Sequence, residues 1–244
     1  MKFKFKDTKV YWINMDHDVE RRERMEKFLE DYSIDATRVS GVKADSVIVG
    51  CDKAHLKVFE QSPNENFIVL EDDSVPSEWF DIHTECEVDG ADGLYLGLSL
   101  WARKEEISTS NERLKKARDM YSSVYANLTQ DSFYKNSGPF LNIYPKHSSG
   151  TRQVTNMLGT HAIYYATKRM KDRAISALEE TLSSKTPRYI DSIYAETLQK
   201  EQNIYALDKP LFYQTSSEAA TKFTLSTHDN DCLTHLKEVY GLPV

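Results

Sequence analysis

The sequence predicts an α/β fold in which helices flank a central β-sheet. Between residues 9 and 73, strand-like and helix-like segments follow the order strand, helix, strand, helix, strand. This order is typical of parallel strands joined by right-handed crossovers. Residues 67–70 are continuously apolar, as expected of a strand that is buried on both faces. With 244 residues, of which 40% are hydrophobic, the chain can bury a core of this kind.

The first predicted strand and helix have clear boundary signals. Lys9–Asn14 has the composition of a strand, and Asp18 can cap a helix over Val19–Asp31. Within this helix the apolar residues recur at three- and four-residue spacing, which predicts one buried face formed by Met25, Phe28 and Leu29.

The next strand and helix lead into the apolar run. Residues 36–42 form the second predicted strand. Gly50 opens the second predicted helix, whose buried face is formed by Leu56, Val58 and Phe59. We therefore expect three parallel strands, the last of which is the strand at residues 67–70.

The later part of the chain is less regular. Residues 102–150 are mainly polar with interspersed aromatics, which indicates an insertion that is functional or mobile rather than part of the core. Around it we predict strands at 93–98, 160–165 and 203–207 and helices at 167–182 and 189–200. Because there is no internal repeat and no linker rich in Gly or Ser, we expect a single domain over residues 1–244.

Composition and charge argue against several classes of protein. The net charge of −7 is unfavourable for extended nucleic-acid binding, which needs a positive surface. No apolar stretch reaches the roughly 18 residues of a membrane helix, and residues 1–6 lack the apolar segment of a signal peptide. Cys51, Cys86 and Cys232 are odd in number and scattered, which favours free thiols and a cytoplasmic location.

Three adjacent carboxylates, Glu71, Asp72 and Asp73, follow the apolar run. Open α/β sheets bind ligands at the carboxyl ends of their strands. Adjacent acids repel one another unless a cation or hydrogen-bond donors hold them in place. A hard divalent ion, Mn²⁺ or Mg²⁺, that is also bridged to phosphates meets this need, so the triplet predicts a metal–nucleotide site. An exposed acidic turn is the alternative interpretation. Strand alternation places Glu71 and Asp73 on one face and Asp72 on the other.

Polar residues of neighbouring elements are further candidates. Asn14 ends the first strand, and Arg21 begins the next helix with a guanidinium suited to phosphate. Lys53 and His55 lie in the first turns of the helix that opens at Gly50, where backbone N–H groups favour an anion. A solvated helix face for Arg21 and a buried structural histidine for His55 are the alternatives.

Asp191 is the candidate from the later part of the chain. It lies near the start of a predicted helix with an apolar face, where an ordinary first-turn acid is the alternative interpretation. His228 and His235 are additional candidates for a metal shell.

Read in order, these segments resemble family 25 glycosyltransferases, the family of lipopolysaccharide-type and collagen galactosyltransferases. The segments that carry the resemblance are Trp12-Ile13-Asn14-Met15-Asp16, Glu20-Arg21-Arg22-Glu23-Arg24-Met25, Gly50-Cys51-Asp52-Lys53-Ala54-His55, Val69-Leu70-Glu71-Asp72-Asp73 with Pro76, Gly159-Thr160-His161-Ala162, Asp191, and Pro210-Leu211 with Gln214. They span nearly the whole chain except the insertion at 102–150.

The resemblance implies a GT-A fold, which is a Rossmann-like mixed sheet flanked by helices with an acceptor-side insertion. A nucleotide-binding half would cover about residues 1–100 and an acceptor half about residues 101–244. It also implies a metal-dependent hexosyltransferase of glycan biosynthesis that inverts the anomeric carbon. The donor would be a nucleotide-diphosphate sugar, a UDP-sugar first, carrying galactose or glucose. The acceptor would be a hydroxyl of a glycan or a protein.

The resemblance assigns a role to each candidate. Asp73 and Glu71 would hold the metal. The nucleotide site would be formed by Asn14, Arg21, Lys53, His55 and Asp72. Inverting transfer needs a base for the acceptor hydroxyl, for which Asp191 is the candidate and Asp72 or an acid of the insertion the alternative.

The chain also departs from the family pattern. Ala54 stands where the family usually has Ser, and residues 215–219 match the usual Ser-Asp-containing stretch poorly. Two other functions stay open. A nucleotidyltransferase also uses paired acids and Mg²⁺, but it usually carries a Gly-rich loop that this chain lacks. A catalytically silent relative could bind a glycan or protein partner, but it would not need to keep three repelling carboxylates.

Overall fold

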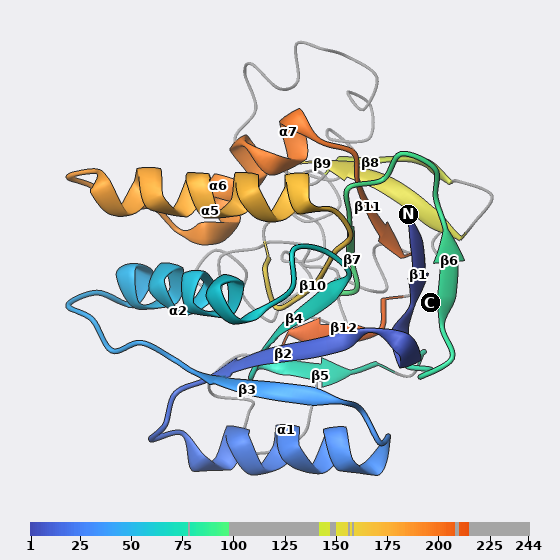
Figure 1. The fold of residues 1–244 in the computed structure, drawn as a ribbon, viewed down its shortest axis with the longest axis horizontal. Coiled ribbons are helices and arrows are strands. Elements are labelled where there is room, and N and C mark those ends of the chain that lie inside the picture. The colour runs from blue at the N-terminus through green and yellow to red at the C-terminus, as the bar shows by residue number, and fades with distance from the viewer. Residues whose placement is uncertain are drawn as a thin grey trace, which may run out of the picture.

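The computed structural model describes residues 1–77, 79–97, 142–146, 150–155, 157, 159–207 and 210–214, with the backbone alone for 142–146, 152, 155 and 213. These residues form an α/β structure with a mixed sheet of eight strands in the order β3-β2-β4-β10-β7-β11-β9-β8. Helices cover both faces of this sheet, α1 on one side and α2, α5 and α6 on the other (Figure 1).

The elements have the following bounds. The strands of the large sheet are β2 (Lys9–Asn14), β3 (Ala36–Ser40), β4 (Phe67–Glu71), β7 (Gly93–Tyr95), β8 (Asn142–Lys146), β9 (Thr151–Thr155), β10 (Ala162–Tyr165) and β11 (Ile204–Leu207). Two small sheets pair β1 (Lys2–Lys4) with β6 (Glu85–Glu87) and β5 (Ser74–Pro76) with β12 (Phe212–Gln214). The helices are η1 (Phe5–Asp7), α1 (Val19–Asp31), α2 (Val47–Gln61), α5 (Lys168–Ser183), α6 (Ile190–Glu196) and α7 (Leu198–Glu201).

The predicted strand–helix–strand–helix–strand unit is present as β2-α1-β3-α2-β4. Strand β2 pairs in parallel with both β3 and β4. The prediction of an α/β fold with helices flanking a mixed sheet is therefore confirmed. The parallel arrangement does not extend across the sheet, because β10 runs antiparallel to both of its neighbours, β4 and β7.

Strand β4 is at the centre of the core and explains the direction of the acids that follow it. All four of its apolar side chains, residues 67–70, are 0% exposed. Phe67 and Val69 belong to the apolar cluster that includes residues of α2, α5 and α6, whereas Ile68 and Leu70 belong to the cluster that includes residues of α1. Continuation of this alternation directs Glu71 toward α2 and the next residue toward α1.

The boundaries differ from the predictions at two helices. Helix α2 begins at Val47, three residues before Gly50, because the side chain of Ser46 caps it by accepting a hydrogen bond from the Val49 N–H. The helix predicted over 189–200 is divided into α6 and α7 at Thr197, whose backbone is not helical (φ −116°, ψ −81°).

Several predictions concern residues outside the described part of the chain. These are residues 102–141 of the insertion, His228, His235 and Cys232. None of the helices in the described part of the chain is both long and apolar enough to cross a lipid bilayer.

Candidate functional site

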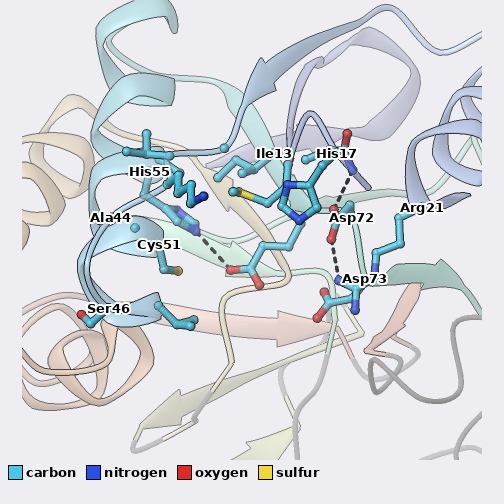
Figure 2. Close-up of a pocket in the computed structure, with 18 residues that line it drawn as sticks. Ile13, His17, Arg21, Ala44, Ser46, Cys51, His55, Asp72 and Asp73 are labelled. Atoms are coloured by element: carbon cyan, nitrogen blue, oxygen red, sulfur yellow. Dashed lines mark hydrogen bonds and ion pairs between the residues drawn. The ribbon is translucent and has the colours of Figure 1, made fainter. Parts of the chain in front are cut away.

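A cavity of about 460 Å³ lies at the carboxyl ends of β2, β3 and β4. Figure 2 shows it between the first turns of α2 and the acidic turn after β4. Strands β3 and β4 lie on opposite sides of β2, and α1 and α2 pack on opposite faces of the sheet. The cavity therefore occupies the topological switch point, where open α/β sheets bind their ligands.

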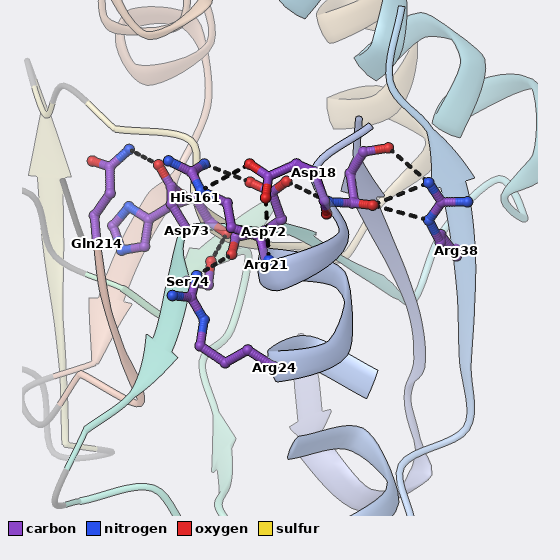
Figure 3. A network of polar contacts seen from close by, with 10 residues as sticks. Asp18, Arg21, Arg24, Arg38, Asp72, Asp73, Ser74, His161 and Gln214 are labelled. Atoms are coloured by element: carbon purple, nitrogen blue, oxygen red, sulfur yellow. Dashed lines mark hydrogen bonds and ion pairs between the residues drawn. The ribbon is translucent and has the colours of Figure 1, made fainter. Parts of the chain in front are cut away.

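The side chain of Asp72 holds the acidic turn to the first strand and helix (Figure 3). Its Oδ2 accepts a hydrogen bond of 2.8 Å from Asn14 Nδ2, and its Oδ1 accepts one of 2.8 Å from Arg21 Nη1. Arg24 Nη2 donates to the Asp72 backbone carbonyl at 2.8 Å. Three of the predicted nucleotide-site residues thus bond to one another, which fixes the position of the turn. Asn14, Arg21 and Asp72 also line the cavity.

Arg38 is a part of this network that the sequence did not single out. It donates to Asn14 Oδ1 from Nε at 3.2 Å and from Nη2 at 3.0 Å, and Nη2 also reaches Asp16 Oδ1 at 2.6 Å. Its hydrogen bond is the main reason why the pKa of the Asp16 carboxyl lies below its usual value. A single arginine within a β-strand is only a weak sequence signal, because the exposed face of a strand often carries one.

Glu71 points toward α2, as the alternation along β4 predicts. Its Oε1 lies 3.1 Å from His55 Nε2 and accepts a hydrogen bond of 2.5 Å from the Thr160 hydroxyl. Burial opposes ionisation of Glu71, but His55, Thr160 and His161 together outweigh it and hold its pKa below the usual value. The Glu71 carboxylate therefore joins α2, β4 and the approach to β10.

Asp73 lines the cavity beside Glu71 and Asp72. It is half-buried, and its Oδ2 accepts a hydrogen bond of 3.1 Å from Gln214 Nε2 on β12. Burial, and then the charge of Glu71, raise the pKa of Asp73 to about 8, against the opposing effect of Arg21. The shift comes first from the cost of burying a charged carboxylate and second from its repulsion by Glu71.

Lys53 lies apart from the cavity, whereas another lysine borders it. Lys53 is exposed on α2 and is not among the cavity-lining residues. Lys43, in the loop before α2, does line it, together with Ser46 and Gly50 at the start of the helix. Lys43 lies in the loop before α2, outside any recognisable motif, and so no local sequence signal singles it out.

Asp191 lies in the first turn of α6 and is not among the cavity-lining residues. Its Oδ1 accepts a hydrogen bond of 2.6 Å from the Ser192 N–H. Burial raises the pKa of Asp191, and the charge of Glu71 raises it further. The structure thus brings Asp191 within electrostatic reach of Glu71 but leaves it outside the cavity lining.

Two more buried groups surround the site. Asp52 on α2 is 0% exposed, and burial raises its pKa to about 6. His161 is 1% exposed, and burial lowers its pKa to about 4. The absence of a side chain at Gly97 makes room for this ring, because a Cβ there would lie 2.0 Å from His161 Nε2. In the sequence, Asp52 and His161 appear only within the segments that carry the family resemblance, and neither was predicted to belong to the site.

No model of a known protein family matches this chain, and a search of curated proteins finds no match to it. The function is therefore inferred from the fold and the geometry of the site.

Proposed function

We propose that this protein is a metal-dependent inverting glycosyltransferase with a GT-A type fold. It would transfer a hexose, galactose or glucose, from a nucleotide-diphosphate sugar, a UDP-sugar first, to a hydroxyl of a glycan or protein. The observation that carries the proposal is the pair of carboxylates, Glu71 and Asp73, in a cavity at the switch point of the sheet.

The shape and polarity of the cavity support a nucleotide-diphosphate ligand. Its volume of about 460 Å³ is within the range of small-molecule sites, roughly 300–1,000 Å³. The first turn of α2 borders it, and the N–H groups and dipole of a helix N-terminus attract phosphate. Lys43 adds a positive charge at the same edge.

The two carboxylates fit a hard divalent ion. Both offer oxygen ligands that line the cavity, and a bound cation would offset the burial and the charge of Glu71 that raise the pKa of Asp73. When bound, Mn²⁺ or Mg²⁺ would supply positive charge to stabilise the departing diphosphate. Asp72 would act indirectly, since its bonds to Asn14 and Arg21 hold the acidic turn in place.

The base that receives the proton of the acceptor hydroxyl is proposed to be Asp191. Burial raises the pKa of Asp191, which makes its carboxylate a stronger proton acceptor. Asp191 does not line the cavity, so the acceptor hydroxyl would meet it outside the pocket that holds the nucleotide.

Thermal unfolding with a panel of nucleotide sugars tests the proposal. We expect a UDP-hexose to stabilise the protein only when Mn²⁺ is present. Lys43→Ala should weaken that binding roughly tenfold, or about 1.4 kcal/mol, because Lys43 lines the cavity. The matched variant Lys53→Ala, which removes an exposed lysine of α2, should leave it unchanged.

The products formed by the same samples distinguish the competing functions. Transfer predicts release of UDP, and Asp191→Asn should retain donor binding but lose that release. Release of hexose 1-phosphate instead, from attack at the α-phosphorus of the UDP-hexose, would indicate a nucleotidyltransferase. Donor binding without turnover on any acceptor would indicate a silent relative, and the absence of stabilisation by every donor would overturn the proposal.

A further inference from the structure

Cys51, His55 and Glu71 converge on one point of the cavity wall. Cys51 and His55 are four residues apart on α2 and therefore share a helix face, while Glu71 ends the neighbouring strand β4. One potential ligand atom from each residue lies within 4.8 Å of the other two. Figure 2 shows the Cys51 side chain beside the contact between His55 and the Glu71 carboxylate.

The separations are close to those of a metal centre. Two ligands bonded to Zn²⁺ at about 2.0–2.3 Å with a tetrahedral angle are roughly 3.5 Å apart. His55 Nε2 and Glu71 Oε1 are already 3.1 Å apart, and no separation among the three ligand atoms exceeds 4.8 Å. The three atoms therefore lie near the spacing of a coordinated ion before any ion is bound.

We propose that Cys51, His55 and Glu71 form a binding site for a borderline-soft divalent ion such as Zn²⁺. Thiolate and imidazole ligands favour Zn²⁺, whereas Mg²⁺ and Mn²⁺ prefer oxygen. The site shares Glu71 with the carboxylate pair proposed for the hard ion, but it differs in chemistry because Cys51 and His55 supply sulfur and nitrogen where Asp73 supplies oxygen. It also stands without the glycosyltransferase proposal, because it rests on the ligand atoms alone.

A second layer of groups supports the site. In many metal centres the ligating histidine donates its other ring N–H to a carboxylate. His55 Nδ1 is buried and has no hydrogen-bond partner among the described residues. Asp52, three residues earlier on α2, is fully buried, interacts electrostatically with His55, and has no hydrogen bond to either carboxylate oxygen within the described structure. A metal at Nε2 would fix the proton on Nδ1 and provide Asp52 with a donor on its own helix face.

The position of the three residues defines what the ion would do. All three line the cavity, so a fourth coordination position would face the space where a ligand binds. Three protein ligands with one open position are typical of zinc sites that bind water or substrate. The ion would also join α2 to the end of β4, and so fix the wall of the cavity.

Cobalt titration of the full-length protein tests the site. After removal of metals with a chelator, one equivalent of Co²⁺ should produce a near-ultraviolet thiolate-to-cobalt charge-transfer band that one equivalent of Zn²⁺ abolishes. Cys51→Ser should lose the band and bind Zn²⁺ at least tenfold more weakly. The matched control is the variant Cys86→Ser/Cys232→Ser, which retains Cys51 as its single cysteine and should keep the band.

Several outcomes would overturn the proposal. They are a band that persists in Cys51→Ser, a band that is lost in the control, and Co²⁺ binding without thiolate charge transfer. If Cys51→Ser fails to fold, X-ray absorption of the zinc-loaded wild-type protein decides the question. We expect one sulfur at about 2.3 Å in the first shell, and a shell of nitrogen and oxygen alone would reject the site.

Discussion

Asp72 accepts hydrogen bonds on both carboxylate oxygens, from donors that belong to two different elements. Asn14 ends β2 and Arg21 lies in α1, so the carboxylate joins both of them to the turn after β4. The side chains of Arg21 and Asp72 are 18% and 12% exposed, and Asn14 is 1% exposed. Removal of the Asp72 carboxylate would leave the buried donors of Asn14 and Arg21 without an acceptor. The free-energy cost of such unsatisfied groups exceeds the net stability that the intact contacts provide.

We therefore expect Asp72→Ala to lower the free energy of unfolding by about 3 kcal/mol or more, as measured by urea titration. The control is Asp31→Ala on α1, the helix that also carries Arg21. It breaks the exposed ion pair between Lys27 and Asp31, whose side chains are 74% and 52% exposed. That loss should be below about 1 kcal/mol. Equal losses for the two variants would show that the Asp72 contacts add nothing to stability.

Among the elements, α2 contributes most to the shape of the site, because its first turns and the loop before them form one wall. The close approach of loop and helix depends on Gly50. A Cβ at this position would lie 2.5 Å from the Val42 carbonyl oxygen, a backbone atom that cannot rotate away. Val42 and Gly50 both line the cavity, so the contact also defines its edge.

Gly50→Ala tests this contact against helix propensity. Propensity alone predicts that alanine in a helix stabilises by about 1 kcal/mol. We expect the opposite, a loss of roughly 1–3 kcal/mol from overpacking, together with weaker binding of the nucleotide sugar because the loop must move outward. Urea titration and the Mn²⁺-dependent thermal shift measure the two effects. A gain in stability would contradict the packing of residues 41–46 against α2.

At the scale of the whole molecule, the sequence predicts local elements better than the order of the strands. The bounds of β2 and α1 agree with the predictions because caps and apolar spacing are local signals. The placement of β10 beside β4 is not local. Both strands are buried on both faces, so neither has an alternation that would reveal its direction or its neighbour.

The same difference between local and non-local features applies to the residues of the site. The alternation along β4 correctly separates Glu71 from Asp72, because it is a property of consecutive residues. The partners of these acids come from distant segments, as Thr160 does for Glu71 and Asn14 for Asp72. Such pairs depend on tertiary packing, and single-sequence patterns carry no information about them.

The buried charges of the site also determine how stability depends on pH. Asp73 has a pKa of about 8 when folded and an ordinary value of 3.8, so the folded state retains a proton that the unfolded state has lost. Ionisation of Asp73 therefore lowers the free energy of unfolding as pH rises from 3.8 to about 8. His161, with a pKa of about 4 when folded against 6.5, has the opposite effect, because stability is lost as pH falls below 6.5. Above pH 6.5, the stability no longer changes through His161, and the loss caused by ionisation of Asp73 remains.

Metal-free protein is therefore expected to lose up to about 2 kcal/mol of stability between pH 6.5 and 8, at 1.36 kcal/mol per pKa unit, measured by urea titration at each pH. Asp73→Asn should remove this loss, because a neutral amide can still accept the hydrogen bond from Gln214 without the cost of a buried charge. It should also abolish stabilisation by Mn²⁺ with a nucleotide sugar, whereas in the wild-type protein that stabilisation should increase with pH. A variant that is more stable at pH 8 yet cannot bind metal would show that the site retains Asp73 at a cost to folding. A wild-type profile that stays flat from pH 6.5 to 8 would instead mean that Asp73 is already compensated in the free protein.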